Sequence, residues 1–408
     1  MAPETYHHIV HWPLFGQVDL HFLMNEIFMV FFFGIAAKEI TESCLPGGAL
    51  NPIRKAINPL FGTVGGVLGP IGVYFALVAA FGHTETYGRG WGIPTATDIA
   101  LAWLVARMVF GKSHPAVNFL LLLAVADDAI GMGIIAVFYP DPSHPVSPMW
   151  LTLTAGAGVM AFVMRRLQIQ EWTAYVFGPG ILSWLGLYLA HLHPALALVF
   201  VVPFLPSAKR DLGLFQEDVD EHAHHSPLEQ FEHSMKTFVD FGLFFFAFCN
   251  AGVEFSDIGP ATWYVLSALV IGKTVGITGF SWVADRAGFP LPRGMQLRHL
   301  VVAGLVASMG LTVALFVAGE AFEGGPQLEA KMGALLSGLG AVAALVAGRM
   351  LKLKSEIPEE IFDVEPDAGI ASELASPVVV ESAVASDGVA FEREVDEEEE
   401  REGDVVLH

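Results

Sequence analysis

The chain has 408 residues, of which 53% are hydrophobic and only 16% charged, and its mean hydropathy is +0.54. This composition excludes an ordinary soluble domain and is typical of a protein that crosses a lipid bilayer several times. The formal net charge of −22 does not favour a nucleic-acid partner. Two cysteines, neither in a metal-ligand spacing, exclude a disulfide framework.

A helix needs about 20 mostly apolar residues to cross a bilayer, and the sequence contains about eleven such segments. They lie near residues 21–37, 57–82, 91–110, 115–139, 147–164, 172–190, 192–206, 237–253, 260–284, 299–320 and 330–350. No segment resembles a cleavable secretory signal, so the first span is expected to stay in the mature protein. We predict an external N-terminal segment over 1–20, an all-α transmembrane helix bundle over 21–354 and an acidic tail over 355–408.

The third span carries an acidic residue near its middle. In "GWGIPTATDIALAWL", Pro94 and two threonines precede Asp98, a pattern that favours an interrupted helix. A charged side chain inside a membrane is expensive and usually faces the protein interior or a water-filled path. Asp98 is therefore either a satisfied structural group or part of a functional site.

The fourth span, "LLLLAVADDAIGMGIIAVFY", places Asp127 and Asp128 side by side. Consecutive helix positions point about 100° apart, so the two carboxylates cannot both face the same partner. Because they repel each other and burial disfavours their charge, each competes for a positive ion. Carboxylate oxygens suit sodium, lithium and protons rather than soft metals, so we expect bound Na+ at Asp128 and Asp127.

The loop after the seventh span contains His222, His224 and His225 in "EHAHHSP". Histidine changes charge near neutral pH, so this cluster could sense pH. An adventitious metal site and a solvated loop are the alternatives.

The ninth span, "YVLSALVIGKTVGITGFSWVA", buries Lys273. A charge at the centre of a spanning helix costs about 2.5 to 3.5 kcal/mol, so a partner is expected. Asp127 or Asp128 can supply the opposite charge. Lys273 is then either a structural counter-ion or a group that itself exchanges a proton.

The tenth span contains "ASMGLTVALF", in which Gly310 and Thr312 faintly resemble "TATDIALA" of the third span. The two spans would cross the membrane in opposite directions, as an inverted repeat demands. Interrupted helices in corresponding halves mark the central binding site of many transporters. We therefore predict that Thr97, Asp98, Gly310 and Thr312 meet where two broken helices cross, with a carboxylate near the helix N-termini.

The basic residues predict the orientation. Nearly all lysines and arginines of the short loops fall on one side of the predicted spans, whereas Arg89 and Lys331 fall on the other. Because basic residues concentrate in the cytoplasm, the N-terminus is expected outside and the tail inside. The tail holds 18 of the 43 acidic residues and only two arginines, a composition typical of a disordered, solvated segment.

Five motifs also carry a family resemblance. They are "GWGIPTATDIALA", "LAVADDAIGMGIIAVFY", "SPLEQFEHSMKTFVDFGLFFFAFCNAGVEF", "LVIGKTVGITGFSW" and "GLTVALFVAGEAF". Their order and spacing resemble bacterial sodium/proton antiporters of the NhaA family, from about residue 20 to about residue 352. The resemblance implies inverted repeats with two crossed, broken helices, multi-pass insertion in the bacterial inner membrane, and exchange of cytoplasmic Na+ or Li+ for external protons.

The resemblance also assigns roles to residues. Asp128 resembles the cation-binding aspartate, and Asp127 resembles the partner of Lys273. Glu39 matches a glutamate of the pH-responsive funnel, and Glu232 with His233 matches an acidic-histidine pair.

The chain departs from the family pattern in three places. The first family span and the extended hairpin segment through which family dimers associate are not apparent, which puts homodimerisation by that route in doubt. Glu42 stands where the family has an arginine, and Thr274 stands where it has a proline.

We therefore predict a secondary antiporter for pH and sodium homeostasis, with no enzyme activity and no cofactor. A sodium-coupled symporter of an organic solute on a similar fold is the main alternative. An intramembrane aspartyl protease would need motifs that do not surround the aspartates here, and a retinal protein would have about seven spans.

Overall fold

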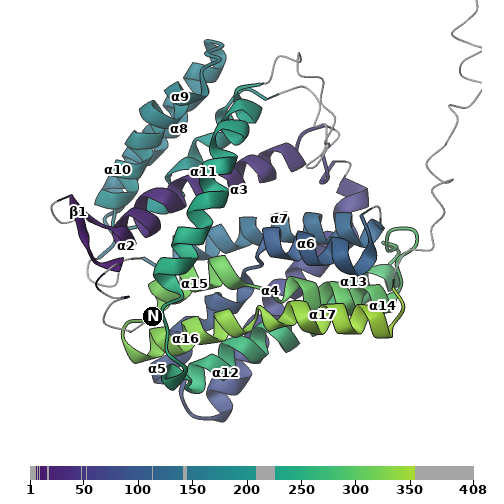
Figure 1. Ribbon diagram of the computed structural model, residues 1–408. Coiled ribbons are helices and arrows are strands. Elements are labelled where there is room, and N and C mark those ends of the chain that lie inside the picture. Colours follow the sequence, from purple (N-terminus) through teal and green to yellow (C-terminus); the bar gives the residue numbers. More distant parts are fainter. Residues whose placement is uncertain are drawn as a thin grey trace, which may run out of the picture. The chain divides into compact units, whose positions relative to one another are not determined.

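The computed structural model describes residues 6, 8, 10–15, 18–46, 48–51, 53–112, 114–140, 145–207 and 226–353. These residues are predominantly α-helical, as the composition predicts (Figure 1). The predicted acidic tail and His222, His224 and His225 lie outside the described residues.

The N-terminal half begins with a short hairpin and continues with helices of very different length. Its elements are β1 (Pro13–Phe15), β2 (Val18–Asp19), α2 (Leu20–Phe22), the π-helical η1 (Leu23–Phe28), α3 (Met29–Ser43), α4 (Ile53–Ala80), α5 (Thr84–Tyr87), the 3₁₀ segment η2 (Gly88–Thr95), α6 (Ile99–Phe110), α7 (Pro115–Phe138), η3 (Pro148–Trp150), α8 (Leu151–Arg166), α9 (Trp172–Tyr175), η4 (Val176–Gly180) and α10 (Ile181–Leu189).

The C-terminal half continues in the same way. Its elements are the 3₁₀ segments η5 (Pro194–Phe200) and η6 (Val202–Phe204), then α11 (Pro227–Asn250), η7 (Phe255–Asp257), α12 (Pro260–Ser267), the π-helical η8 (Ala268–Lys273), α13 (Thr274–Arg286), α14 (Leu297–Ala307), α15 (Leu311–Ala321), α16 (Gly325–Leu336) and α17 (Leu339–Met350).

Five continuous helices in the described part are long and apolar enough to cross a membrane, and two bent pairs raise this number to seven. The remaining predicted spans fall on helices that are shorter or more polar, such as α8 and α11. The count of eleven stays a prediction. The apolar lengths nevertheless identify a helical membrane protein.

The hairpin of β1 and β2 is antiparallel, with Pro13 opposite Asp19 and Phe15 opposite Val18. This short hairpin lies in the segment 1–20 that precedes the first predicted span, and the absence of the family's extended dimer hairpin stays a prediction. Homodimerisation stays a prediction.

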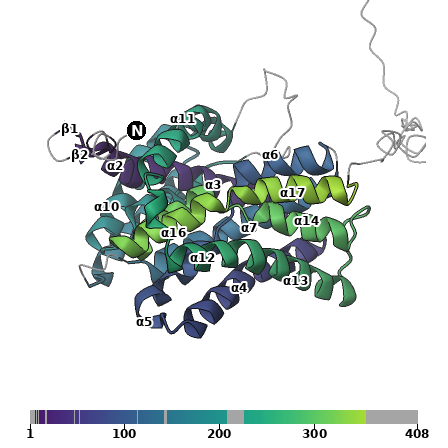
Figure 2. The ribbon, with the colours of Figure 1, turned by 60° about the horizontal axis from the view of Figure 1, so that its bottom comes forward.

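Helix α4 packs along η8 and α13, and the three elements lie side by side in both views (Figures 1 and 2). Glycines four residues apart on each partner line the contact: Gly65 and Gly69 on α4, and Gly272 and Gly276 opposite them. A Cβ atom at Gly276 would lie 2.0 Å from the carbonyl oxygen of Gly65. Small residues at this spacing let two membrane helices bring their backbones together, and this contact holds the segment that carries Lys273.

Gly276→Ala is expected to lower the thermal unfolding midpoint of the purified protein, because the added methyl group meets backbone that cannot rotate away. Overpacking of this kind costs about 1–3 kcal/mol. Gly279→Ala on the same helix is the control, since a Cβ there has open space around it. Equal midpoints for the two variants would contradict the steric argument.

Candidate functional site

Two helices are broken near the middle of the molecule, at the residues where the sequence predicts interruptions. The axes of the Thr84–Thr95 and Ile99–Phe110 helices differ by 56°, and those of α14 and α15 differ by 51°. Pro94 lies within η2, where its ring and missing N–H prevent a regular α-helix. The chain is extended at Ala96 before α6 begins.

The two breaks contact each other directly. The backbone N–H of Asp98 donates a hydrogen bond to the carbonyl oxygen of Met309 at 2.7 Å. A Cβ atom at Gly310 would lie 2.9 Å from the carbonyl oxygen of Ala96, so this close approach requires a residue without a side chain. The structure therefore brings Thr97, Asp98, Gly310 and Thr312 into one crossing.

Asp98 caps both half-helices that start at the crossing. Its Oδ1 accepts a hydrogen bond at 3.1 Å from the backbone N–H of Leu101, which lies in the first turn of α6. Its Oδ2 accepts from the hydroxyl of Thr312 at 2.9 Å and from its backbone N–H at 3.3 Å, in the first turn of α15. One buried carboxylate thus satisfies N–H donors at two helix N-termini, where the helix dipoles favour negative charge.

Asp127 and Lys273 form a buried ion pair. The ammonium of Lys273 is 2.7 Å from Oδ2 of Asp127, and neither side chain is exposed. Thr97 joins the pair: its hydroxyl donates to the same Oδ2 at 2.6 Å and accepts from Lys273. The π-helical turn of η8 ends at Lys273, and such turns are frequent at functional sites.

Asp128 is the neighbour without such a partner. Its side chain is buried, and its Oδ1 has no hydrogen-bond partner among the described residues. Asp127, Glu39 and Asp98 add negative charge around it, whereas Lys273 is the positive group within electrostatic range. A buried carboxylate in this situation needs an ion or a proton to become neutral.

The residues with an implied role in pH sensing are only partly brought together. Glu39 on α3 lies within electrostatic range of both Asp128 and Glu232. Glu232 pairs with Lys38, but His233 is exposed.

Lys38 belongs to the basic residues on the predicted cytoplasmic side of the spans. The structure buries it, and its ammonium contacts Glu42 at 2.6 Å and also Glu232. The spacing from Lys38 to Glu42 is one helical turn, which was the available signal for this pair. No pattern in the sequence indicates that Glu232, which is distant along the chain, pairs with Lys38.

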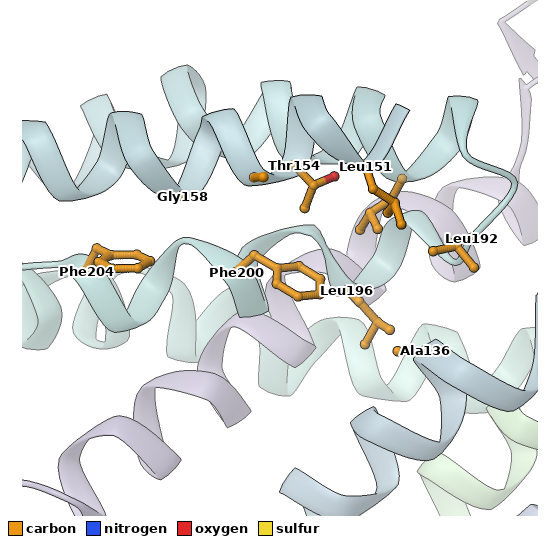
Figure 3. A pocket seen from close by; sticks show the side chains of 10 residues that line it. Ala136, Leu151, Thr154, Gly158, Leu192, Leu196, Phe200 and Phe204 are labelled. Atoms are coloured by element: carbon orange, nitrogen blue, oxygen red, sulfur yellow. The ribbon is translucent and has the colours of Figure 1, made fainter. Parts of the chain in front are cut away.

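An apolar pocket lies apart from these charged groups, between α8, α10, η5 and η6 (Figure 3). Its volume is about 430 Å³, and Thr154 is the one residue with a polar side chain among those that line it. Apolar walls offer no ligands to a hard cation. The carboxylate pair, and not this pocket, offers the oxygen atoms that a hard cation needs.

Comparison with known proteins gives a consistent result. The family model described as Na+/H+ antiporter 1 matches residues 1–351. A Na(+)/H(+) antiporter NhaA of Desulfitobacterium hafniense (strain DSM 10664 / DCB-2) is 58% identical over 356 residues, which cover 87% of this chain and 90% of the relative. The corresponding protein of Geobacter metallireducens is 59% identical over 357 residues, 87% of this chain and 92% of the relative. The corresponding protein of Jannaschia sp. (strain CCS1) is 43% identical over 369 residues, which cover 85% of this chain and 87% of the relative.

Asp98→Ala is expected to destabilise the protein more than loss of a single helix cap, because it leaves N–H donors unpaired at two helices. Each cap contributes about 1 kcal/mol, so the two together amount to about 2 kcal/mol. Ser226→Ala is the matched control, since Ser226 caps α11 alone. Thermal unfolding of the two purified variants measures the difference, and an equal loss would show that Asp98 does not cap both helices.

Proposed function

Because the chain belongs to the Na+/H+ antiporter 1 family, it is an integral inner-membrane protein that exchanges sodium for protons, and we propose that the two ions compete for Asp128 and Asp127. The alternatives of a symporter, an intramembrane protease and a retinal protein do not describe this chain. The observation that carries the proposal is the unpartnered, buried oxygen of Asp128 beside an aspartate that already has a counter-ion.

The charges of the site support a competition between the two ions. Asp127 and Asp128 carry two negative charges when ionised, whereas Lys273 supplies one positive charge. One further cation makes the group neutral, and either a proton or an alkali cation can provide that charge. Because both bind to the same carboxylate oxygens, they exclude each other, and binding of the cation releases the proton.

The crossed helices support alternating exposure of this site to the two sides of the membrane. We propose eleven spans, with the broken spans in two inverted halves, so that the carboxylates lie near the middle of the bilayer. Asp98 ties α6 to α15, which lets the two broken helices move as one unit past the spans around them. If more protons enter than sodium ions leave, each net charge gains about 2.3 kcal/mol per 100 mV of membrane potential.

In this proposal, the ions pass between the carboxylate pair and the cytoplasm along a path that contains Glu39 and then the group of Lys38, Glu42 and Glu232. We place this end of α3 in the cytoplasm, the N-terminus outside and the tail inside, following the basic residues. Transport of Li+ and a role in pH and sodium homeostasis belong to the same proposal. Glu39 and Glu232 would respond to cytoplasmic pH together with Lys38, which supplies the positive charge where Glu42 replaces the family's arginine.

Asp128→Asn is expected to abolish exchange, because an amide has no negative charge. It can neither take up the proton nor hold the cation. Everted vesicles with a pH-sensitive dye measure this: sodium should dissipate a preformed proton gradient with the native protein and not with the variant. Asp240→Asn is the control, since Asp240 is an exposed carboxylate on α11. Persistent exchange by Asp128→Asn would refute the assignment.

The sodium concentration that gives half-maximal exchange is expected to rise as pH falls. Competition by mass action predicts an increase of about tenfold per pH unit for each proton that one sodium ion displaces. Titrating sodium over a pH series in the same vesicles measures this slope. A half-saturating concentration that does not change with acid pH would mean that the two ions bind at separate groups.

A further inference from the structure

A second group of buried charged residues lies at the end of α3 opposite to Glu39. His193, just before η5, places its Nε2 3.0 Å from Oε2 of Glu320 in the last turn of α15. The side chain of His193 is 6% exposed and that of Glu320 is 29% exposed. The ring of Phe316 packs edge-on against the imidazole, with 4.8 Å between ring centroids.

The other nitrogen of His193 is the unusual feature. Nδ1 is buried and has no hydrogen-bond partner among the described residues. A histidine that only fastened η5 to α15 would need one nitrogen, and burying the second without a partner costs free energy. The structure thus keeps an imidazole with one nitrogen on a partly exposed carboxylate and the other facing the protein interior.

Further charged groups on neighbouring elements lie within electrostatic range of this pair. Glu26 in η1 lies within electrostatic range of both His193 and Glu320. Lys331 on α16 is buried, lies within range of Glu320 and donates a hydrogen bond to Asn250 at 3.2 Å. His21 on α2 lies within range of Glu320 and Lys331. We call His193, Glu320, Glu26, Lys331 and His21 the outer cluster.

The helices connect the outer cluster with the ion site. Glu320 follows Thr312 by eight residues on α15, which corresponds to about 12 Å along the helix axis. Glu26 precedes Glu39 by thirteen residues on the continuous Leu20–Ser43 helix, about 20 Å. The outer cluster therefore lies on the side of the crossing away from Glu39, the side that the basic residues assign to the exterior.

The position of Glu320 also argues against a purely structural role. A carboxylate in the last turn of a helix faces the negative end of the helix dipole and needs compensation. His193 and Lys331 supply positive charge there, so the fold surrounds an unfavourably placed acid with groups that hold it.

We propose that Glu320 and His193 form the site at which external protons enter, before they reach Asp128 and Asp127. A proton from outside binds the partly exposed carboxylate of Glu320. The O–H bond then breaks as an N–H bond forms at Nε2 of His193, and the proton on Nδ1 passes to a water molecule on the inner side. Glu320 is then ionised again and the imidazole is neutral, with its remaining proton on Nε2. Rotation of the ring by half a turn brings this N–H to the inner side before the next transfer. This proposal rests on the proposed function and adds an outer proton-binding pair to it.

Sodium efflux from right-side-out vesicles tests the proposal. The vesicles are loaded with labelled sodium, and the external pH is lowered in steps while the internal pH is held constant. Glu320→Gln and His193→Gln are expected to lower proton-driven efflux at least about tenfold, because a positioned proton-transfer group contributes a hundredfold or more to such steps. Glu323→Gln is the matched control, since Glu323 is an exposed carboxylate three residues farther along the chain.

A second measurement separates this proposal from the proposed function. Exchange of labelled for unlabelled sodium, at equal alkaline pH on both sides, requires Asp128 but no external proton. The Glu320 and His193 variants should keep this exchange, whereas Asp128→Asn should lose it. Equal proton-driven efflux by Glu320→Gln and Glu323→Gln would overturn the outer site. A parallel loss of sodium–sodium exchange by Glu320→Gln would also overturn it, because the pair would then only hold the fold. If His193→Gln does not insert, Glu320→Gln alone decides between these outcomes.

Discussion

The burial of three ionisable side chains in an apolar helix bundle is the constraint on which the rest of the structure depends. Each of Asp127, Asp128 and Lys273 would be expensive alone in a medium that cannot hydrate it. The pairing of Asp127 with Lys273 and Thr97 removes most of that cost for two of the three. Asp128 remains, with a buried oxygen that has no hydrogen-bond partner among the described residues. In the proposed function it is the group whose energy depends on which ion is bound.

Two features of the backbone make this arrangement possible. Helix breaks create free N–H and C=O groups in a region without water, and those groups must be satisfied within the protein. Asp98 satisfies donors at two helices, and the bond from its own N–H to Met309 locks the breaks together. The glycines of α4 and α13 bring a second pair of backbones close, which positions Lys273 against the crossing. A small displacement at the crossing of the two broken helices, or at the glycine contact with α4, would therefore change the environment of the carboxylates.

The sequence predicts the central site better than its surroundings, for a physical reason. A charge within an apolar span is rare enough to be recognised without knowing its partner, so Asp98, Asp127, Asp128 and Lys273 stand out. Partners that are distant in sequence leave no such trace: nothing links Lys38 to Glu232, or His193 to Glu320, until the helices are packed. Lys331 is predicted on the external side of the spans, and the sequence gives no sign that α16 buries it beside Glu320.

The two charged groups at the ends of α3 differ in a way that suits exchange between unlike compartments. At the end proposed to face the cytoplasm, Lys38 is shared by Glu42 and Glu232. On the outer side, the group contains histidine, whose two nitrogens can accept and release protons near neutral pH. Negative charge attracts both ions, whereas the neutral nitrogen of an imidazole binds a proton and not sodium. The proposed outer pair would therefore select protons without binding the sodium that the central carboxylates are proposed to hold.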